Sequence, residues 1–306
     1  MSHKILIDTD PGIDDAMAIF YAALHPQIDI VGMTSVFGNV TTEIATRNAI
    51  FLAEKVGQNI PVAKGAEKPI VMDPNGVSDY VHGVEGFGSM VAQKITGEPL
   101  DEPAYEFICR MINENPGEII LCAIGPLTNI ALALDYDPTI TTKAKAVYIM
   151  GGGLNQGNVT KFAEANIWND PHAADAVLAA EWEVTMVGLD ITTRVQCVPA
   201  DFADLAISTP EIGNFLNEAV QFYMDFYAVH YGKRGCDMHD PTAIIAITDP
   251  QYFTIENHAL EVILDGARVG QTIRSTDISR PKHRVPMNVD AQSVKQRFLS
   301  MIKTGF

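Results

Sequence analysis

Four aspartates fall within eight positions near the start of the chain, in the stretch ILIDTDPGIDDA at residues 5–16. Asp8 and Asp10 follow a run of apolar residues, and Asp14 and Asp15 begin a helical pattern. Like charges about 4 Å apart repel by about 4 kcal/mol at an effective dielectric constant near 20. Calcium and magnesium prefer such oxygen ligands, so we expect a divalent cation here. Helix capping and the helix dipole could alone account for two of the acids, and Asp8 could serve only the turn.

A histidine–aspartate pair lies in a second polar segment, GCDMHDPTAIIAIT at residues 235–248. His239 is a candidate general acid or base near neutral pH, because an unperturbed histidine has a pKa of about 6.5. Asp240 precedes a proline and an apolar helical run, so it could equally be an ordinary helix cap.

The richest segment is MGGGLNQGNVTKFAEANIWNDPHAA at residues 150–174. Its three consecutive glycines allow close approach of the backbone, and Asn158, Glu164 and Asn166 follow them. The segment lacks both common phosphate-loop patterns, so amides and a carboxylate without arginine favour a neutral polyhydroxyl ligand such as a sugar. A solvated, turn-rich loop is the alternative. Together with a cation and a histidine, a sugar site suits hydrolysis at an anomeric carbon.

Alternating apolar strands and helical patterns must position these groups. We expect strands at 4–8, 28–36, 118–124, 145–150 and 184–190, helices at 14–24, 42–57, from about 127 and at 171–181, and a strand-rich patch near 259–275. This alternation predicts an α/β fold, a single doubly wound (Rossmann-like), mostly parallel sheet with helices on both faces. We find no linker or repeat, so residues 1–306 are expected to form one domain. In such sheets ligands bind beyond the carboxyl ends of the strands, where the polar groups described above collect.

The composition excludes several classes of partner. The formal net charge is −17, which disfavours nucleic acid and anionic membranes. No run of 18 apolar residues predicts a membrane span, and the start MSHKILID has no apolar region typical of a signal peptide, so we expect a cytoplasmic protein. The four cysteines are scattered, which indicates reduced residues rather than a zinc site.

The motifs DTDPGIDDA, GPLTN at 125–129, the 150–174 segment and HDP at 239–241 together resemble those of the nucleoside hydrolases. The resemblance spans nearly the whole chain and implies cleavage of ribonucleosides to base and ribose, with a role in nucleoside salvage. It implies that Ca²⁺ is held by the carboxylates of Asp10, Asp15 and Asp240 and by the backbone carbonyl of Ile124. Asp10 would also be the general base for the attacking, metal-held water.

The same resemblance assigns the ribose and base contacts. The residues expected around the ribose and the attacking water are Asp14, Asn39, Met150 (through its backbone), Asn158, Glu164 and Asn166. His239 would protonate the leaving base, as in the inosine–uridine preferring type. The stretch VHGVEGFG at 81–88 resembles the family's flexible loop, with His82 near the base. Tyr223 and Tyr227 share one helix face and could contact the base or pack in the core.

Several readings stay open at the level of the sequence. The base preference is expected to be inosine and uridine or broad, with a pyrimidine-restricted ribonucleoside hydrolase as the alternative. A magnesium-dependent phosphohydrolase with Asp8 as nucleophile and Asp10 as acid is more remote, as is a calcium-dependent sugar-binding protein without catalysis. The resemblance also implies a homo-oligomer, either a dimer or a tetramer.

Overall fold

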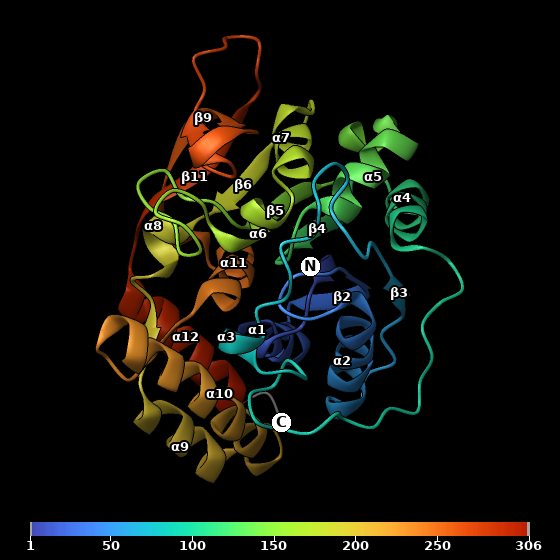
Figure 1. The fold of residues 1–306 in the computed structure, drawn as a ribbon. Helices are drawn as coiled ribbons and strands as arrows, with labels where there is room; N and C mark the ends of the chain where they lie inside the picture. The colour runs from blue at the N-terminus through green and yellow to red at the C-terminus, as the bar shows by residue number, and fades with distance from the viewer. Residues whose placement is uncertain (1, 305–306) are drawn as a thin grey trace.

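A nine-stranded, mostly parallel sheet forms the centre of the computed structural model, which describes residues 2–304 (Figure 1). The strand order is β10-β9-β11-β6-β5-β4-β1-β2-β3. The strands of this sheet are β1 (His3–Thr9), β2 (Ile28–Ser35), β3 (Val62–Lys64), β4 (Ile119–Ala123), β5 (Ala146–Met150), β6 (Val184–Val187), β9 (Phe253–Val262), β10 (Thr272–Arg274) and β11 (Lys282–Val289). Neighbouring strands from β3 to β11 are parallel, whereas β9 is antiparallel to both β11 and β10. The α/β class is therefore confirmed.

Helices cover both faces of the sheet and enclose two apolar clusters. One face carries α1 (Ile13–Leu24), α2 (Thr42–Lys55) and α11 (His239–Thr248), and α12 (Ala291–Thr304) packs on α1 and α11. The other carries α4 (Ala104–Glu114), α5 (Thr128–Tyr136) and α7 (Pro171–Ala179). The helices α9 (Pro199–Ser208) and α10 (Pro210–Tyr231) pack against each other, and α10 also contacts α1 (Figure 1).

Several short helices and a small β-ribbon lie near the carboxyl edge of the sheet. They are α3 (Asp79–His82), α6 (Ala165–Asn169), α8 (Leu189–Thr192) and a two-stranded ribbon of β7 (Gln196–Cys197) and β8 (Cys236–Asp237). Single 3₁₀ turns occur at Pro138–Thr142, Pro250–Tyr252 and Gly266–Arg268.

The helix α1 explains how the aspartate motif is presented. Residues 13–22 are all buried, because α1 is covered by α10, α11 and α12 as well as the sheet. The Pro11–Gly12 turn ends β1, and the Gly12 N–H donates to the Asp15 carboxylate at 3.0 Å, which fixes the first turn of the helix. Asp14 and Asp15 are therefore held in the interior rather than on the surface.

The topology places this turn where a ligand is expected. From β1 the chain adds β2 and β3 on one side of the sheet, and β4 then pairs with β1 on the other side. Such a reversal leaves a crevice at the carboxyl ends of the two central strands. Asp10 follows β1, and Ile124 follows β4.

The strand-rich patch is present as predicted, and one other strand expectation needs correction. The patch predicted near 259–275 is a hairpin in which β9 ends at Val262 and β10 begins at Thr272, with a 3₁₀ turn between them. The strand predicted over 184–190 ends at Val187, because Gly188 is the N-cap of α8. The apolar run does not mark the end of β6, because the residues directly after Val187 are also buried.

The four cysteines are buried and free. Within residues 2–304, no helix combines the length and the apolar character needed to cross a membrane.

Candidate functional site

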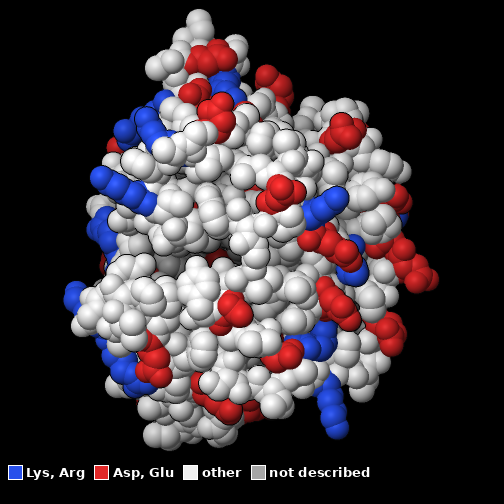
Figure 2. All heavy atoms as spheres, viewed as in Figure 1, with Lys and Arg blue, Asp and Glu red and all other residues white. Residues whose placement is uncertain are grey.

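A cavity of about 450 Å³ opens at the carboxyl edge of the sheet. Its walls include most of the residues predicted for the site: Asp14, Asn39, His82, Ile124, Met150, Asn158, Glu164, Asn166, Tyr223, Tyr227, His239 and Asp240. Asp10 and Asp15 lie beneath this wall and are buried. In Figure 2 the face is hollowed near its middle, and Lys and Arg side chains lie mostly towards its margins.

Buried carboxylates form the floor of the cavity. Asp14, Asp15 and Asp240 each offer an oxygen, and these atoms lie within 4.8 Å of one another, so the group could hold a metal ion. Asp10 adjoins the group. Its Oδ1 and the Asp14 Oδ1 are buried and accept no hydrogen bond from the described residues. Unpartnered buried acceptors are costly, so these oxygens fit the ligand set of a hard cation.

The same crowding shifts the acidities of these groups. Burial, followed by the charges of Asp15 and Asp14, raises the pKa of Asp10 well above its usual range. Burial and the three neighbouring carboxylates likewise raise the pKa of Asp240. Positive charge placed among the carboxylates would reverse this effect, because it favours their ionised forms.

The surrounding residues orient two of the carboxylates. Asp15 accepts hydrogen bonds from the Thr9 hydroxyl at 2.5 Å and from the Asn39 amide at 3.0 Å. The Asn39 backbone N–H donates to Asp10 Oδ2 at 2.6 Å, which leaves Oδ1 as the free oxygen of Asp10. A Cβ on Gly125 would lie 2.7 Å from that oxygen, so only glycine permits this approach after β4.

Asp8 has a structural environment. It is fully buried, accepts hydrogen bonds from Thr34 at 2.5 Å and Asn129 at 2.7 Å, and does not line the cavity. Burial raises its pKa to about 7. The phosphohydrolase alternative needs Asp8 in contact with substrate, and this placement argues against it.

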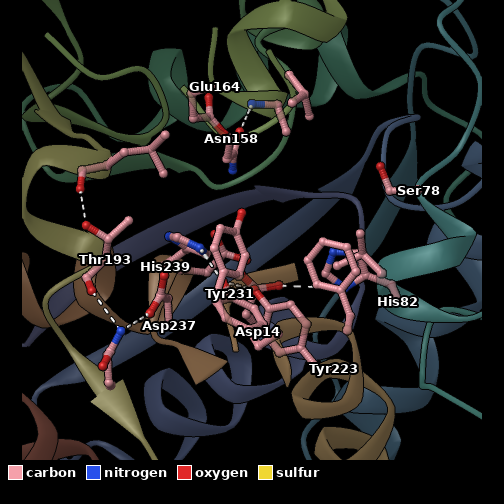
Figure 3. A pocket seen from close by; sticks show the side chains of 18 of the residues that line it. Asp14, Ser78, His82, Asn158, Glu164, Thr193, Tyr223, Tyr231, Asp237 and His239 are labelled. Carbon is pink, nitrogen blue, oxygen red and sulfur yellow. Dashed lines mark hydrogen bonds and ion pairs between the residues drawn. The ribbon is translucent and has the colours of Figure 1, made fainter. Parts of the chain in front are cut away.

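The opposite wall carries the predicted sugar contacts (Figure 3). Glu164 caps α6 and accepts hydrogen bonds from the backbone of Gly152 and Asn166, both at 2.9 Å. The Asn166 amide donates to the carbonyls of Ile124 at 2.9 Å and Met150 at 3.0 Å. These contacts fix the side chains before any ligand arrives.

His239 is linked to the tyrosines of α10. Its Nδ1 lies 2.8 Å from the Thr192 hydroxyl, and its Nε2 lies 3.1 Å from the Tyr227 hydroxyl. Tyr227 in turn lies 3.5 Å from the Tyr223 hydroxyl. Burial lowers the pKa of His239 to about 4, so the neutral ring is the major form at pH 7. Both ring nitrogens have a hydroxyl group within hydrogen-bonding distance: Thr192 at Nδ1 and Tyr227 at Nε2.

His82 packs on the aspartate turn. Its Nδ1 accepts a hydrogen bond from the Ile13 N–H at 3.2 Å, and its ring lies 5.4 Å from that of Tyr223. The loop at 81–88 therefore lies against Tyr223 of α10.

The cavity has walls that sequence reasoning missed. Tyr231 lines it one helical turn beyond Tyr227, and Gln196 and Asp237 line it from the ribbon of β7 and β8. The spacing of four residues from Tyr223 through Tyr227 could have indicated Tyr231. No local signal marks Gln196, because β7 has only two residues.

Comparison with known proteins identifies the class. The family model described as "Inosine-uridine preferring nucleoside hydrolase" matches residues 5–296. The chain is 39% identical over 279 residues to "Probable uridine nucleosidase 1" of Oryza sativa subsp. japonica, covering 90% of this chain and 86% of that protein. It is 36% identical to the "Inosine-uridine preferring nucleoside hydrolase" of Leishmania major, with coverage of 92% and 91%.

A solved structure described as "Plant nucleoside hydrolase - PpNRh1 enzyme" superposes with a TM-score of 0.97 at 35% identity, over 99% of this chain and 100% of that one. This chain belongs to the inosine-uridine preferring nucleoside hydrolase family. It is thus an enzyme whose substrates are nucleosides.

Proposed function

We propose that this enzyme hydrolyses ribonucleosides to base and ribose with Ca²⁺ as its metal ion, with uridine and inosine as substrates. The observation that carries the calcium proposal is the group of buried carboxylates with unpartnered oxygens on the cavity floor. The residues proposed as ligands are Asp10, Asp15 and Asp240, with the carbonyl of Ile124. When bound, the ion would offset their repulsion and lower the pKa of a nearby water molecule.

The proposed chemistry begins with Asp10. Its Oδ1 is the free carboxylate oxygen, so Asp10 would accept a proton from the water that attacks the anomeric carbon. The bond to the base breaks in an oxocarbenium-like transition state. Glu164 and Asp14 line the same cavity, and their negative charge would stabilise the positive charge that develops on the ribose.

Asp14 lies close to the proposed metal ligands, which its position in the sequence did not indicate. It was predicted as a ribose ligand, but its carboxylate lies in the same group as Asp15 and Asp240. We propose that Asp14 binds the ribose. The other residues proposed around the ribose are Asn39, Met150, Asn158, Glu164 and Asn166. Asp14 also lies close enough to Asp15 and Asp240 to contact the metal ion as well as the ribose.

The leaving base needs a proton, and we propose that His239 supplies it by way of Tyr227. The proton donor would be the imidazolium form of His239, in which Nδ1–H donates to the Thr192 hydroxyl and Nε2–H donates to the Tyr227 hydroxyl. Burial makes this the minor form at pH 7, so the step draws on the protonated fraction of the ring. Tyr227 would donate its own proton to the base as it receives the Nε2 proton of the His239 imidazolium, which is left as the neutral ring. Tyr223 and His82 would line the base side of the cavity.

Release of ribose tests this function. Uridine and inosine are incubated with the enzyme in phosphate-free buffer containing calcium, and reducing sugar is measured. We expect release without phosphate. A requirement for phosphate would indicate a phosphorylase, and binding without any release would indicate the calcium-dependent sugar-binding alternative.

We also propose a cytoplasmic role in nucleoside salvage and a homodimer or homotetramer. Light scattering of the purified protein measures the second property directly, and a monomer would contradict it.

A further inference from the structure

The ribbon of β7 and β8 presents a buried carboxylate to the cavity that the chemistry above does not use. Asp237 is only 7% exposed and lines the cavity. Figure 3 places it beside His239 and Tyr231, across the cavity from Glu164 and Asn158. Within residues 2–304, no lysine or arginine forms an ion pair with it; the nearby Arg234 is bonded to Asp225 at 2.8 Å instead. A buried carboxylate without a counter-ion needs hydrogen-bond donors to offset the cost of its burial.

The geometry of the ribbon explains why Asp237 is held in one orientation. Gln196 and Asp237 are directly opposite in the antiparallel pair. The Met238 N–H donates to the Val195 carbonyl at 2.8 Å, so Gln196 and Asp237 form the non-hydrogen-bonded pair, in which side chains approach closely. The Gln196 amide nitrogen accordingly lies 2.8 Å from Asp237 Oδ1.

The hydrogen bonds of Gln196 leave the Asp237 carboxylate able to act only as an acceptor towards a ligand. The second acceptor of the Gln196 amide nitrogen is the Thr193 carbonyl at 3.2 Å, so both of its hydrogens are used. Within residues 2–304, Gln196 donates to Oδ1 of Asp237, and the Tyr227 hydroxyl lies near enough to favour the ionised carboxylate. Burial raises the pKa of Asp237 to about 6, opposed by Gln196 and Tyr227, so the group is mostly ionised at pH 7 and above.

We propose that Asp237, oriented by Gln196, is a specificity-determining residue that accepts a hydrogen bond from the ring N–H of the nucleobase. Uracil carries such an N–H at N3 and hypoxanthine at N1, each beside a carbonyl group. Cytosine and adenine have an unprotonated ring nitrogen at the corresponding place, which would face the carboxylate lone pairs. The site therefore selects nucleosides whose base contains a lactam N–H. This inference rests on the proposed hydrolysis of ribonucleosides.

The substitution Asp237→Asn makes the sharpest test. Gln196 donates to the atom at the Oδ1 position, so the new amide must place its oxygen there and its NH₂ at the Oδ2 position. A donor would then face the base. We expect kcat/KM for uridine to fall about 10- to 150-fold, the range for a hydrogen bond to a charged group, while that for cytidine holds or rises. Cleavage of p-nitrophenyl riboside, which has no such N–H, should stay within about twofold.

Two further measurements keep the inference falsifiable if that variant is unstable. The wild-type enzyme should discriminate against N3-methyluridine relative to uridine, and Asp237→Ala should reduce that ratio at least tenfold. Asp29→Asn, an exposed aspartate on β2, is the matched control for loss of one charge and should leave every ratio unchanged.

Equal losses on uridine, cytidine and p-nitrophenyl riboside would overturn the inference and indicate a role in folding or in proton transfer. Unchanged ratios would overturn it as well. If the wild-type enzyme releases no ribose from any ribonucleoside, the proposed function itself fails and the inference fails with it.

Discussion

The buried carboxylates on the cavity floor lower the stability of the fold. Asp10, Asp14, Asp15 and Asp240 are all buried, and the charges of the first three raise the pKa of Asp240. A core built only for stability would place apolar residues there, since unpaired buried charges are strongly unfavourable. Their clustering at one cavity floor is therefore best explained by the chemistry of the site.

Replacement of Asp10 should disable the reaction whatever the leaving group. We expect Asp10→Ala to lower kcat at least about 100-fold for both inosine and p-nitrophenyl riboside, because activation of water is needed for either. Steady-state rates on both substrates measure this. A loss confined to inosine would contradict the role of Asp10 as general base.

Replacement of His239 should separate the two substrates. We expect His239→Ala to lower kcat for inosine about 100-fold or more and to spare p-nitrophenyl riboside, whose leaving group needs no proton. Tyr227→Phe should show the same split, because the Tyr227 hydroxyl is the hydrogen-bond partner of His239 Nε2. His258→Ala, which removes an imidazole paired with Glu256 on β9, is the control. Equal loss on both substrates would rule out His239 as the source of the leaving-group proton.

At the scale of elements, the loop that carries His82 depends on α2. Arg47 forms an ion pair with Glu85 at 2.7 Å, and the buried Asn48 amide donates to the carbonyls of Pro11 and Glu85 at 3.0 and 2.9 Å. These contacts join the loop to the aspartate turn. A Cβ on Gly86 would lie 2.6 Å from the Asn48 amide, so the tight approach also requires glycine.

Loss of the Arg47 contact should loosen this loop. We expect Arg47→Ala to lower kcat/KM for uridine about two- to fivefold, the range for one surface or half-buried ion pair, mainly through KM. Arg110→Ala is the matched control, because Arg110 also bridges glutamates but lies on α4. Equal effects of the two substitutions would show that the loop gains nothing from Arg47.

The sequence predicted the strands and helices that are long enough to show a hydrophobic periodicity, and it missed the shorter ones. β1 with α1 and β2 with α2 follow from apolar strands and helical periodicity, and the aspartate motif is local in sequence, so the cavity floor could be predicted. Gln196 and Asp237 meet through strands of only two residues each, which no periodicity can reveal. The pairing of His239 with Tyr227 likewise depends on how α10 and α11 both pack against α1.

At the scale of the whole molecule, the sheet topology brings the ends of β1 and β4 together and places the acidic group between them. In the absence of metal this arrangement should make stability depend on pH. The native carboxylates have raised pKa values, so between about pH 4 and these raised values the folded state binds more protons than the unfolded state. The free energy of unfolding of chelator-treated protein should therefore fall as the pH rises.

Calcium should reverse this trend, because it favours the ionised carboxylates. We expect the rise in Tm on adding calcium to be larger at pH 8 than at pH 5, measured by thermal unfolding in the presence and absence of chelator. An equal rise at both values would contradict the linkage between the carboxylates and the metal ion.

The most direct test of the metal site is to titrate chelator-treated enzyme with calcium. Binding is followed by calorimetry, and uridine cleavage is measured in parallel. We expect one calcium ion per chain, with activity rising in proportion to occupancy, and much weaker binding in Asp240→Asn. Full activity in the metal-free enzyme, or calcium binding that Asp240→Asn leaves unchanged, would contradict the assignment of the buried carboxylates as the metal site.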